Sequence, residues 1–268
     1  MSQYTIEAGT GQHIGDRSEQ QDRVALFSAP KAPGYMLAVV ADGMGGLSGG
    51  TMAAEQAIRT AQQIFEHFSP LTDQVETMLE TIAQEADTII KLSAMSSTKK
   101  PHSTLVLLVI TPQHHAIWTH VGDSRLYYFD GPNCAQRTID HTYLEQLKAE
   151  NKLDKAKMDD AALSNMLVNV LGGRPERLKL DVKRQGGLKA GDAFLLCSDG
   201  LWQYFSDAEL GAAIAMNTAR NACEMLIKKA RERASGSKAD NCTVAVIKLI
   251  KPIAETKNYT AKKMRRAV

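Results

Sequence analysis

The stretch VVADGMGGLSGG, residues 39–50, joins an apolar run to a carboxylate, Asp42, and then to a series of glycines. Five of the eight residues that follow Asp42 are glycine, whereas a turn after a strand needs only one or two. Glycine has no Cβ, so a ligand can approach the backbone closely at these positions. The pattern predicts a buried strand that ends at a ligand-binding site formed by the Asp42 carboxylate and the backbone of the glycines.

The composition is that of a soluble globular protein, with 268 residues of which 44% are hydrophobic. The sequence has 32 Lys and Arg against 30 Asp and Glu, a formal net charge of +2. This net charge is too small to drive nonspecific binding to nucleic acid or to anionic membranes. No targeting or membrane-spanning pattern is visible. The four cysteines have no CxxC spacing and are predicted to be reduced. We therefore expect a cytoplasmic monomer.

Two hydrophobic periods alternate along the chain. Runs rich in branched residues predict strands at 35–41, 105–110, 115–121, 125–129, 193–197 and 243–250. Apolar residues at helical spacing predict helices at about 54–68, 75–90, 143–151, 159–170, 207–216 and 219–234. Two helices are adjacent between strands and the strands at 105–129 are close together, so the order favours antiparallel sheets with helices packed outside them.

Acids stand at the ends of four predicted strands: Asp42, Asp123, Asp199 and Asp240. Each alone has an ordinary explanation as a turn former. If the strands lie side by side, however, the carboxylates converge, and like charges so close together need a cation between them. Because the candidate ligands are oxygens, Mg2+ or Mn2+ is favoured over Zn2+, and the Gly43 carbonyl is a further candidate ligand.

Eight motifs, in this order, resemble the PPM family of type-2C metal-dependent protein serine/threonine phosphatases, bacterial branch. They are GDRSEQQD (15–22), ADGMGG (41–46), HST (102–104), VGDSR (121–125), DHT (140–142), LGG (171–173), LLCSDGLW (195–202) and ADNCTV (239–244). The resemblance implies an α+β fold, an αββα sandwich of two antiparallel sheets packed face to face with helices outside. It also implies a single domain over residues 1–250, with a flap at about 143–170, followed by a basic, disordered tail at 251–268.

The resemblance also implies roles for individual residues. Asp42 would bridge two Mn2+ or Mg2+ ions, the Gly43 carbonyl would bind one of them, and Asp199 and Asp240 would complete the other. Asp22 would hold a water of the centre, and Asp123 would serve a third, weaker ion. Arg17 would bind the substrate phosphate, since its planar fork matches two phosphate oxygens. Asn241 and Ser198 would support the ligands without binding the ions.

The predicted reaction is hydrolysis of phosphoserine and phosphothreonine in proteins by a water that the two ions activate. No C-x5-R loop or DxDx[TV] signature for a phosphoenzyme is present. Expected partners are phosphorylated proteins and a cognate Ser/Thr kinase. Two alternatives stay open: a catalytically silent regulatory module of the same fold, because the VNV stretch (168–170) that closes the flap departs from the family pattern, and a hydrolase of small phosphate esters.

Overall fold

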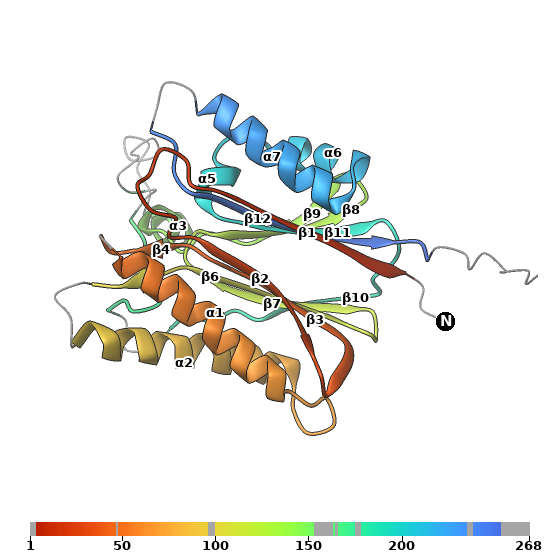
Figure 1. Ribbon diagram of the computed structural model, residues 1–268, viewed down its shortest axis with the longest axis horizontal. Coiled ribbons are helices and arrows are strands. Elements are labelled where there is room, and N and C mark those ends of the chain that lie inside the picture. Colours follow the sequence, from red (N-terminus) through yellow and green to blue (C-terminus); the bar gives the residue numbers. More distant parts are fainter. Residues whose placement is uncertain are drawn as a thin grey trace, which may run out of the picture.

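A computed structural model describes residues 4–46, 48–95, 100–152, 163, 166–174, 178–234 and 238–252. Two antiparallel five-stranded sheets lie face to face, and helices cover the outer face of each (Figure 1). This is the αββα arrangement that the sequence predicts. Among the described residues, no helix is both long and apolar enough to cross a membrane. All four cysteines lie in the described ranges and are free.

The first sheet has the strand order β1-β12-β11-β8-β9. Its strands are β1 (Thr5–His13), β8 (Arg125–Asp130), β9 (Asn133–Arg137), β11 (Asp192–Cys197) and β12 (Cys242–Ile250). β12 pairs with β1 along its whole length, from Thr5 opposite Ile250 to His13 opposite Cys242. Helices α6 (Asp207–Met216) and α7 (Ala219–Arg233) cover the outer face, and a hydrogen-bonded Ser206–Glu209 capping box starts α6.

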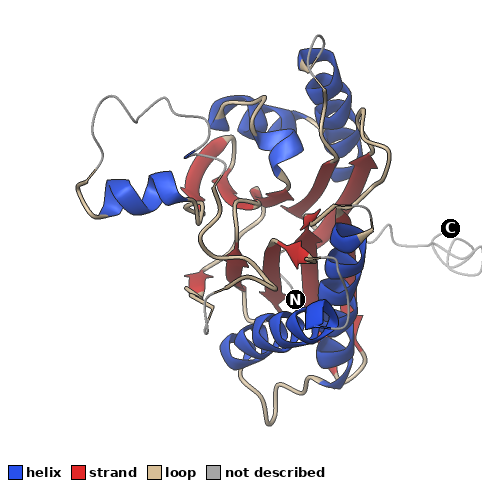
Figure 2. Cartoon of the chain, turned by 90° about the vertical axis from the view of Figure 1, so that its left-hand side faces the viewer, coloured by secondary structure: helices blue, strands red, loops and turns tan. Residues whose placement is uncertain are grey.

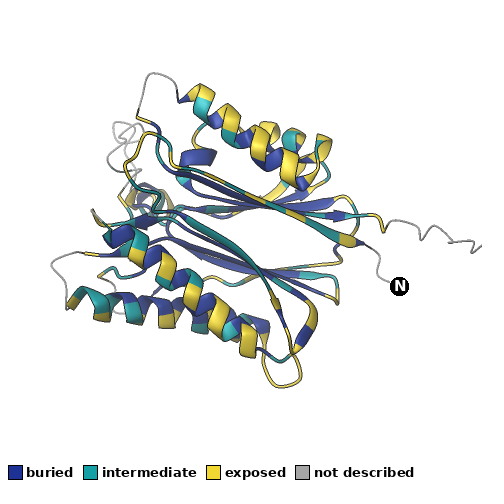
Figure 3. Cartoon of the chain, viewed as in Figure 1, coloured by how far each residue is buried: buried dark blue, intermediate teal, exposed yellow. Residues whose placement is uncertain are grey.

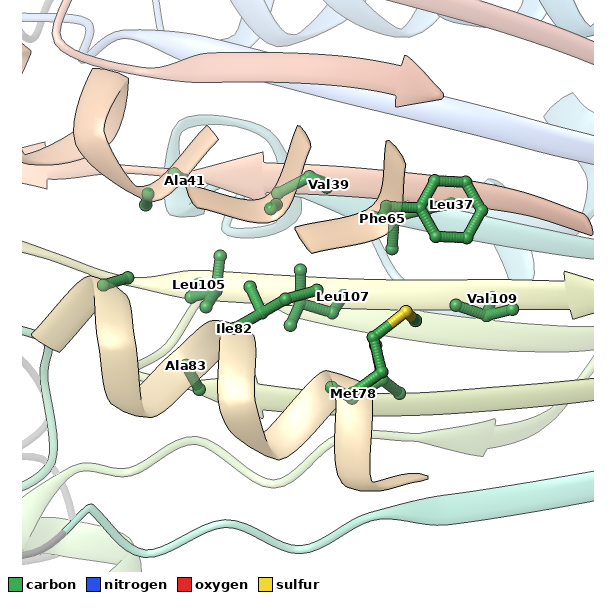
Figure 4. Close-up of a cluster of buried hydrophobic side chains, with 14 of the residues drawn as sticks. Leu37, Val39, Ala41, Phe65, Met78, Ile82, Ala83, Leu105, Leu107 and Val109 are labelled. Atoms are coloured by element: carbon green, nitrogen blue, oxygen red, sulfur yellow. The ribbon is translucent and has the colours of Figure 1, made fainter. Parts of the chain in front are cut away.

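The second sheet has the order β10-β7-β6-β3-β2. Its strands are β2 (Arg23–Ala29), β3 (Ala32–Ala41), β6 (Leu105–Thr111), β7 (His115–Val121) and β10 (Lys183–Gly186). The long helices α1 (Gly49–His67) and α2 (Val75–Met95) cover its outer face. The close-up in Figure 4 shows Phe65 of α1 and Ile82 of α2 among side chains of β3 and β6.

The central strands are nearly continuous apolar runs because both of their faces are buried. In β3, Val39 faces the helices whereas Val40 faces the space between the sheets. In β12, Val246 faces α7 and Ile247 faces the space between the sheets. Figure 3 shows the same pattern: the sheets are mostly buried, while the outer faces of the helices are exposed. Burial on both faces explains why these strands read as continuous hydrophobic runs.

Three short elements complete the end of the sandwich drawn at the left of Figure 1. A two-stranded ribbon pairs β4 (Gly43–Met44) with β5 (His102–Ser103), α3 (Tyr143–Ala149) follows β9, and α5 (Asp199–Trp202) follows β11. The predicted helix at 159–170 is wrong over its last five residues. Leu167 instead forms a β-bridge with Thr142, and the Asn169 side chain bonds to the backbone of Lys179.

The strand predictions are confirmed for the inner strands of the sheets and miss the edge strands. All six predicted strands are present, and they are the three inner strands of each sheet. The four edge strands, β1, β2, β9 and β10, were not predicted. Most of the predicted flap (residues 153–162, 164 and 165) and most of the predicted tail (253–268) lie outside the described residues.

Candidate metal centre

The acids predicted from the sequence meet at one end of the sandwich, which faces the viewer in Figure 2. A pocket of about 480 Å³ opens there. It is lined by Arg17, Ser18, Glu19, Gln21, Asp42, Gly43, Met44, Gly45, Gly46, Asp123, Leu167, Asp199, Asp240 and Asn241. The strands β3, β7 and β11 end at this edge and β2, β8 and β12 begin there, so strand pairing within each sheet and the face-to-face packing of the two sheets bring the acids together.

Asp42 is fixed by the segment that precedes β6. Its N–H donates to Thr104 Oγ1 at 3.0 Å, and its carbonyl accepts from Thr104 N–H at 2.8 Å and from Ser103 Oγ at 3.1 Å. Thr104 Oγ1 also lies 2.7 Å from Ser124 Oγ, next to Asp123. The buried hydroxyl of Thr104 therefore connects the two acid-bearing turns. Sequence analysis assigned this residue no role, and the HST motif was its only signal.

The glycine run has a packing function that the sequence did not reveal. A Cβ on Gly43 would lie 2.1 Å from the Gly50 carbonyl oxygen, and a Cβ on Gly50 would lie 2.5 Å from the Gly43 backbone. Gly45, at φ +133°, would place a Cβ 2.1 Å from the Lys100 carbonyl. The loop thus packs backbone against backbone on the first turn of α1 and on the segment before β5. This close packing keeps Gly43 at the pocket wall.

Asp22 lies behind the pocket and does not line it. Its side chain is buried, and Ser198 Oγ donates to its Oδ2 at 2.7 Å. Ser198 Oγ also accepts from Thr243 N–H at 3.0 Å, so one hydroxyl joins Asp22 to the starts of α5 and β12. Burial raises the pKa of Asp22 to about 6, although its hydrogen bonds from Ser198 and Thr243 oppose the shift.

Mutual repulsion shows that the acids share one electrostatic site. Burial, followed by the charges of Asp22, Asp199, Asp123 and Asp240, raises the pKa of Asp42 well above its ordinary value. Burial and the neighbouring charges of Asp123 and Asp240 raise the pKa of Asp199 to about 8. Burial is also the main cause that raises the pKa of Asp123 to about 6. Such a cluster is stabilised by positive charge placed among its carboxylates.

The donor set fits a hydrated hard cation. In the part of the chain that the structure describes, no three His, Cys, Asp or Glu side chains are arranged to hold an ion by themselves. Mg2+ normally keeps several waters and takes only one or two protein carboxylates, whereas structural Zn2+ requires a closed cage of four ligands. Half-buried acids around a pocket with room for water match the ligand set of Mg2+.

Arg17 stands at the mouth of the pocket on the loop between β1 and β2. Its Nη2 lies 2.6 Å from Asp240 Oδ2, and the Arg17 side chain is 58% exposed. Asn241 holds this loop in place: its Nδ2 donates to the carbonyls of Ile14 and Glu19, and its Oδ1 accepts from Gln21 N–H at 2.7 Å. The Asn241 side chain thus ties the Arg17 loop to the segment that carries Asp240.

Asp16, which sequence analysis did not single out, adds a second tie. Its Oδ2 accepts from Ala239 N–H at 3.0 Å, and its Oδ1 accepts from Arg231 of α7 at 3.1 Å. The arginine bond is the leading cause that lowers the pKa of the Asp16 carboxyl. The position of Asp16 beside Arg17 in the GDRSEQQD motif was the only sequence signal.

Residues 9–218 match the family model of protein phosphatase 2C, so the chain belongs to this family. The chain is 29% identical over 238 residues to the serine/threonine phosphatase stp of Listeria innocua, covering 86% of this chain and 90% of that protein. It is 26% identical over 245 residues to the protein phosphatase PhpP of Streptococcus pneumoniae, covering 89% and 95%.

Solved structures agree on the fold. The serine/threonine phosphatase of S. agalactiae has a TM-score of 0.81 at 24% identity, covering 91% of this chain and 99% of that one. The catalytic domain of PstP, solved in complex with two manganese ions, has a TM-score of 0.73 at 21% identity, covering 92% and 99%. The family, fold class and enzyme class predicted from the sequence are confirmed. The roles of the individual site residues stay predictions.

Proposed function

We propose that this protein hydrolyses phosphoserine and phosphothreonine in protein substrates, with Mn2+ or Mg2+ ions held at the acidic pocket. The observation that supports it most is the convergence of Asp42 with Asp199, Asp240, Asp123 and the buried Asp22. The proposed catalytic domain spans residues 1–250, because β12 completes the sheet that β1 begins. A Ser/Thr kinase that generates the substrates is part of the proposal.

In this proposal Asp42, the Gly43 carbonyl, Asp199 and Asp240 would hold two ions, with the Gly43 carbonyl on one and Asp199 and Asp240 on the other, and Asp123 would hold a third, weaker ion. When bound, the ions neutralise phosphate charge and lower the pKa of a water. Asp22 is fixed by a hydrogen bond from Ser198, and its carboxylate would accept hydrogen bonds from waters bound to the ions. The protein's own side chains bind and orient the substrate.

Arg17 binds the phosphate of the substrate. Its guanidinium is largely exposed at the mouth of the pocket, where a phosphorylated side chain arrives from solvent. The planar fork can bind two phosphate oxygens at once. The ties through Asn241 and Asp16 hold the backbone of the Arg17 loop, and the exposed guanidinium pairs with Asp240 at the pocket. The pocket is open and polar, which suits an extended phosphopeptide.

Phosphate release from a phosphothreonine peptide with added Mn2+ tests the proposal. We expect turnover that EDTA abolishes and that Asp199→Asn reduces by several orders of magnitude, because the substitution removes a charged ligand candidate. Mn2+ binding without turnover would instead identify a silent binding module. Faster turnover of small phosphate esters than of the peptide would identify a small-ester hydrolase.

A further inference from the structure

Trp202, the last residue of α5, contacts a pocket acid from outside the pocket. Its indole Nε1–H donates to the backbone carbonyl of Asp123 at 2.9 Å, and the ring itself does not line the pocket. Asp199 begins the same single helical turn. One side chain therefore links the turn that carries Asp123, between β7 and β8, to the turn that carries Asp199.

The indole is held rigidly from its other side. The Arg125 guanidinium lies 3.4 Å from the centre of the Trp202 ring, a cation–π contact. Arg125 makes two parallel hydrogen bonds to Asp140, Nε to Oδ1 at 2.8 Å and Nη2 to Oδ2 at 2.7 Å. Both side chains are largely buried, at 14% and 12% exposure. Bidentate geometry fixes the plane of the guanidinium and hence the position of the ring beneath it.

His141, next to Asp140, fixes the other half of the same turn. Its backbone N–H donates to the Gly122 carbonyl at 2.9 Å, and its Nδ1 accepts from Gly122 N–H at 3.2 Å. Gly122 has φ +98°, and a Cβ there would lie 2.6 Å from Thr104 Cγ2, so this peptide packs tightly. The Gly122–Asp123 segment is thus hydrogen-bonded by His141 of the DHT motif and by Trp202 of the LLCSDGLW motif.

We propose that Trp202 is a positioning residue: its indole N–H sets the orientation of Asp123 relative to Asp199 and so tunes how tightly the pocket binds Mn2+. The inference depends on the proposed function, since it assumes that these acids bind the ions. It assigns the tryptophan of the LLCSDGLW motif a hydrogen-bonding role in addition to its packing against the hydrophobic core of the first sheet. Removing the indole N–H while keeping an aromatic ring isolates this role.

Trp202→Phe keeps a ring for Arg125 to cover and removes the N–H donor. The measurements are Mn2+ titration by calorimetry, the Mn2+ concentration for half-maximal phosphopeptide hydrolysis, and the melting temperature in EDTA. We expect weaker Mn2+ binding and a higher half-activating concentration, by about tenfold, the lower end of the range for residues that orient metal ligands. The melting temperature should stay close to that of the wild type.

Trp118→Phe is the matched control, because Trp118 is buried between the sheets and packs near Phe194, away from the acids. It should lower the melting temperature and leave Mn2+ affinity unchanged. If Trp202→Phe leaves Mn2+ affinity and half-activation at wild-type values, or only lowers the melting temperature, the inference is wrong while the proposed function stands. If the wild type itself neither binds Mn2+ nor hydrolyses the peptide, the proposed function is what fails.

Discussion

Replacing Thr104 tests whether its buried hydroxyl organises the acid-bearing turns. Thr104→Val keeps the shape of the side chain but leaves the Asp42 N–H and the Ser124 hydroxyl without their partner. Thr104 and Ser124 are fully buried. A buried polar group without a partner costs about 1–3 kcal/mol, so the two together should lower the free energy of unfolding by about 2–6 kcal/mol.

Thr104→Ser is the matched control. It retains the hydroxyl and removes only the methyl group that faces Gly122, so it should cost about 1 kcal/mol. Urea unfolding of the wild type and both variants in EDTA gives the comparison without any contribution from bound ions. Thr104→Val should also lose more phosphatase activity than Thr104→Ser, because the Asp42 N–H loses its hydrogen-bond acceptor. A Thr104→Val protein as stable as Thr104→Ser would refute the reasoning.

Three further predictions follow from contacts at the same end of the sandwich. Arg17→Ala should raise KM for a phosphopeptide more than it lowers kcat, because phosphate is bound in both the ground and the transition state; an unchanged KM in steady-state kinetics would contradict that role. Burial is the main cause that lowers the pKa of His141 to about 3 in the folded protein. In the unfolded chain the pKa is about 6.5, so between about pH 6.5 and 3 the unfolded chain binds one more proton than the folded protein. Stability should therefore fall as pH falls through that window, and His141→Asn should flatten this part of a urea-midpoint profile. Gly50→Ala should lower the free energy of unfolding by about 1–3 kcal/mol, because its Cβ would overlap the Gly43 backbone; an unchanged urea midpoint would show that the loop can move aside.

The strands that could be predicted from the sequence are those with two buried faces. Each inner strand is a nearly continuous apolar run, as LVLLVI at 105–110 illustrates. The edge strands differ: β1, TIEAGTGQH, has no fully buried residue, and β10, KRQG, has none either. An edge strand pairs on one side only and carries polar side chains, so its hydrophobic signal is weak. The missed strands are thus a consequence of position in the sheet.

The site was predictable to the extent that it depends on the ends of inner strands. Asp42, Asp123 and Asp199 each adjoin such a strand, and strand pairing together with face-to-face packing of the two sheets brings the acids to one edge. The groups that hold the acids were not predictable, because their bonds join segments far apart in the chain. Thr104 reaches Asp42 across 62 positions, and Trp202 reaches Asp123 across 79. Neither interaction leaves a local pattern that a single sequence can show.

The placement of β12 has a consequence for biosynthesis. This final strand lies between β1 and β11, and the segment just before it carries Asp240. A chain emerging from the ribosome in N-to-C order can form the second sheet early, but it cannot close the first until nearly all of its length is available. We therefore expect catalytic competence to arise only when translation of the domain is complete.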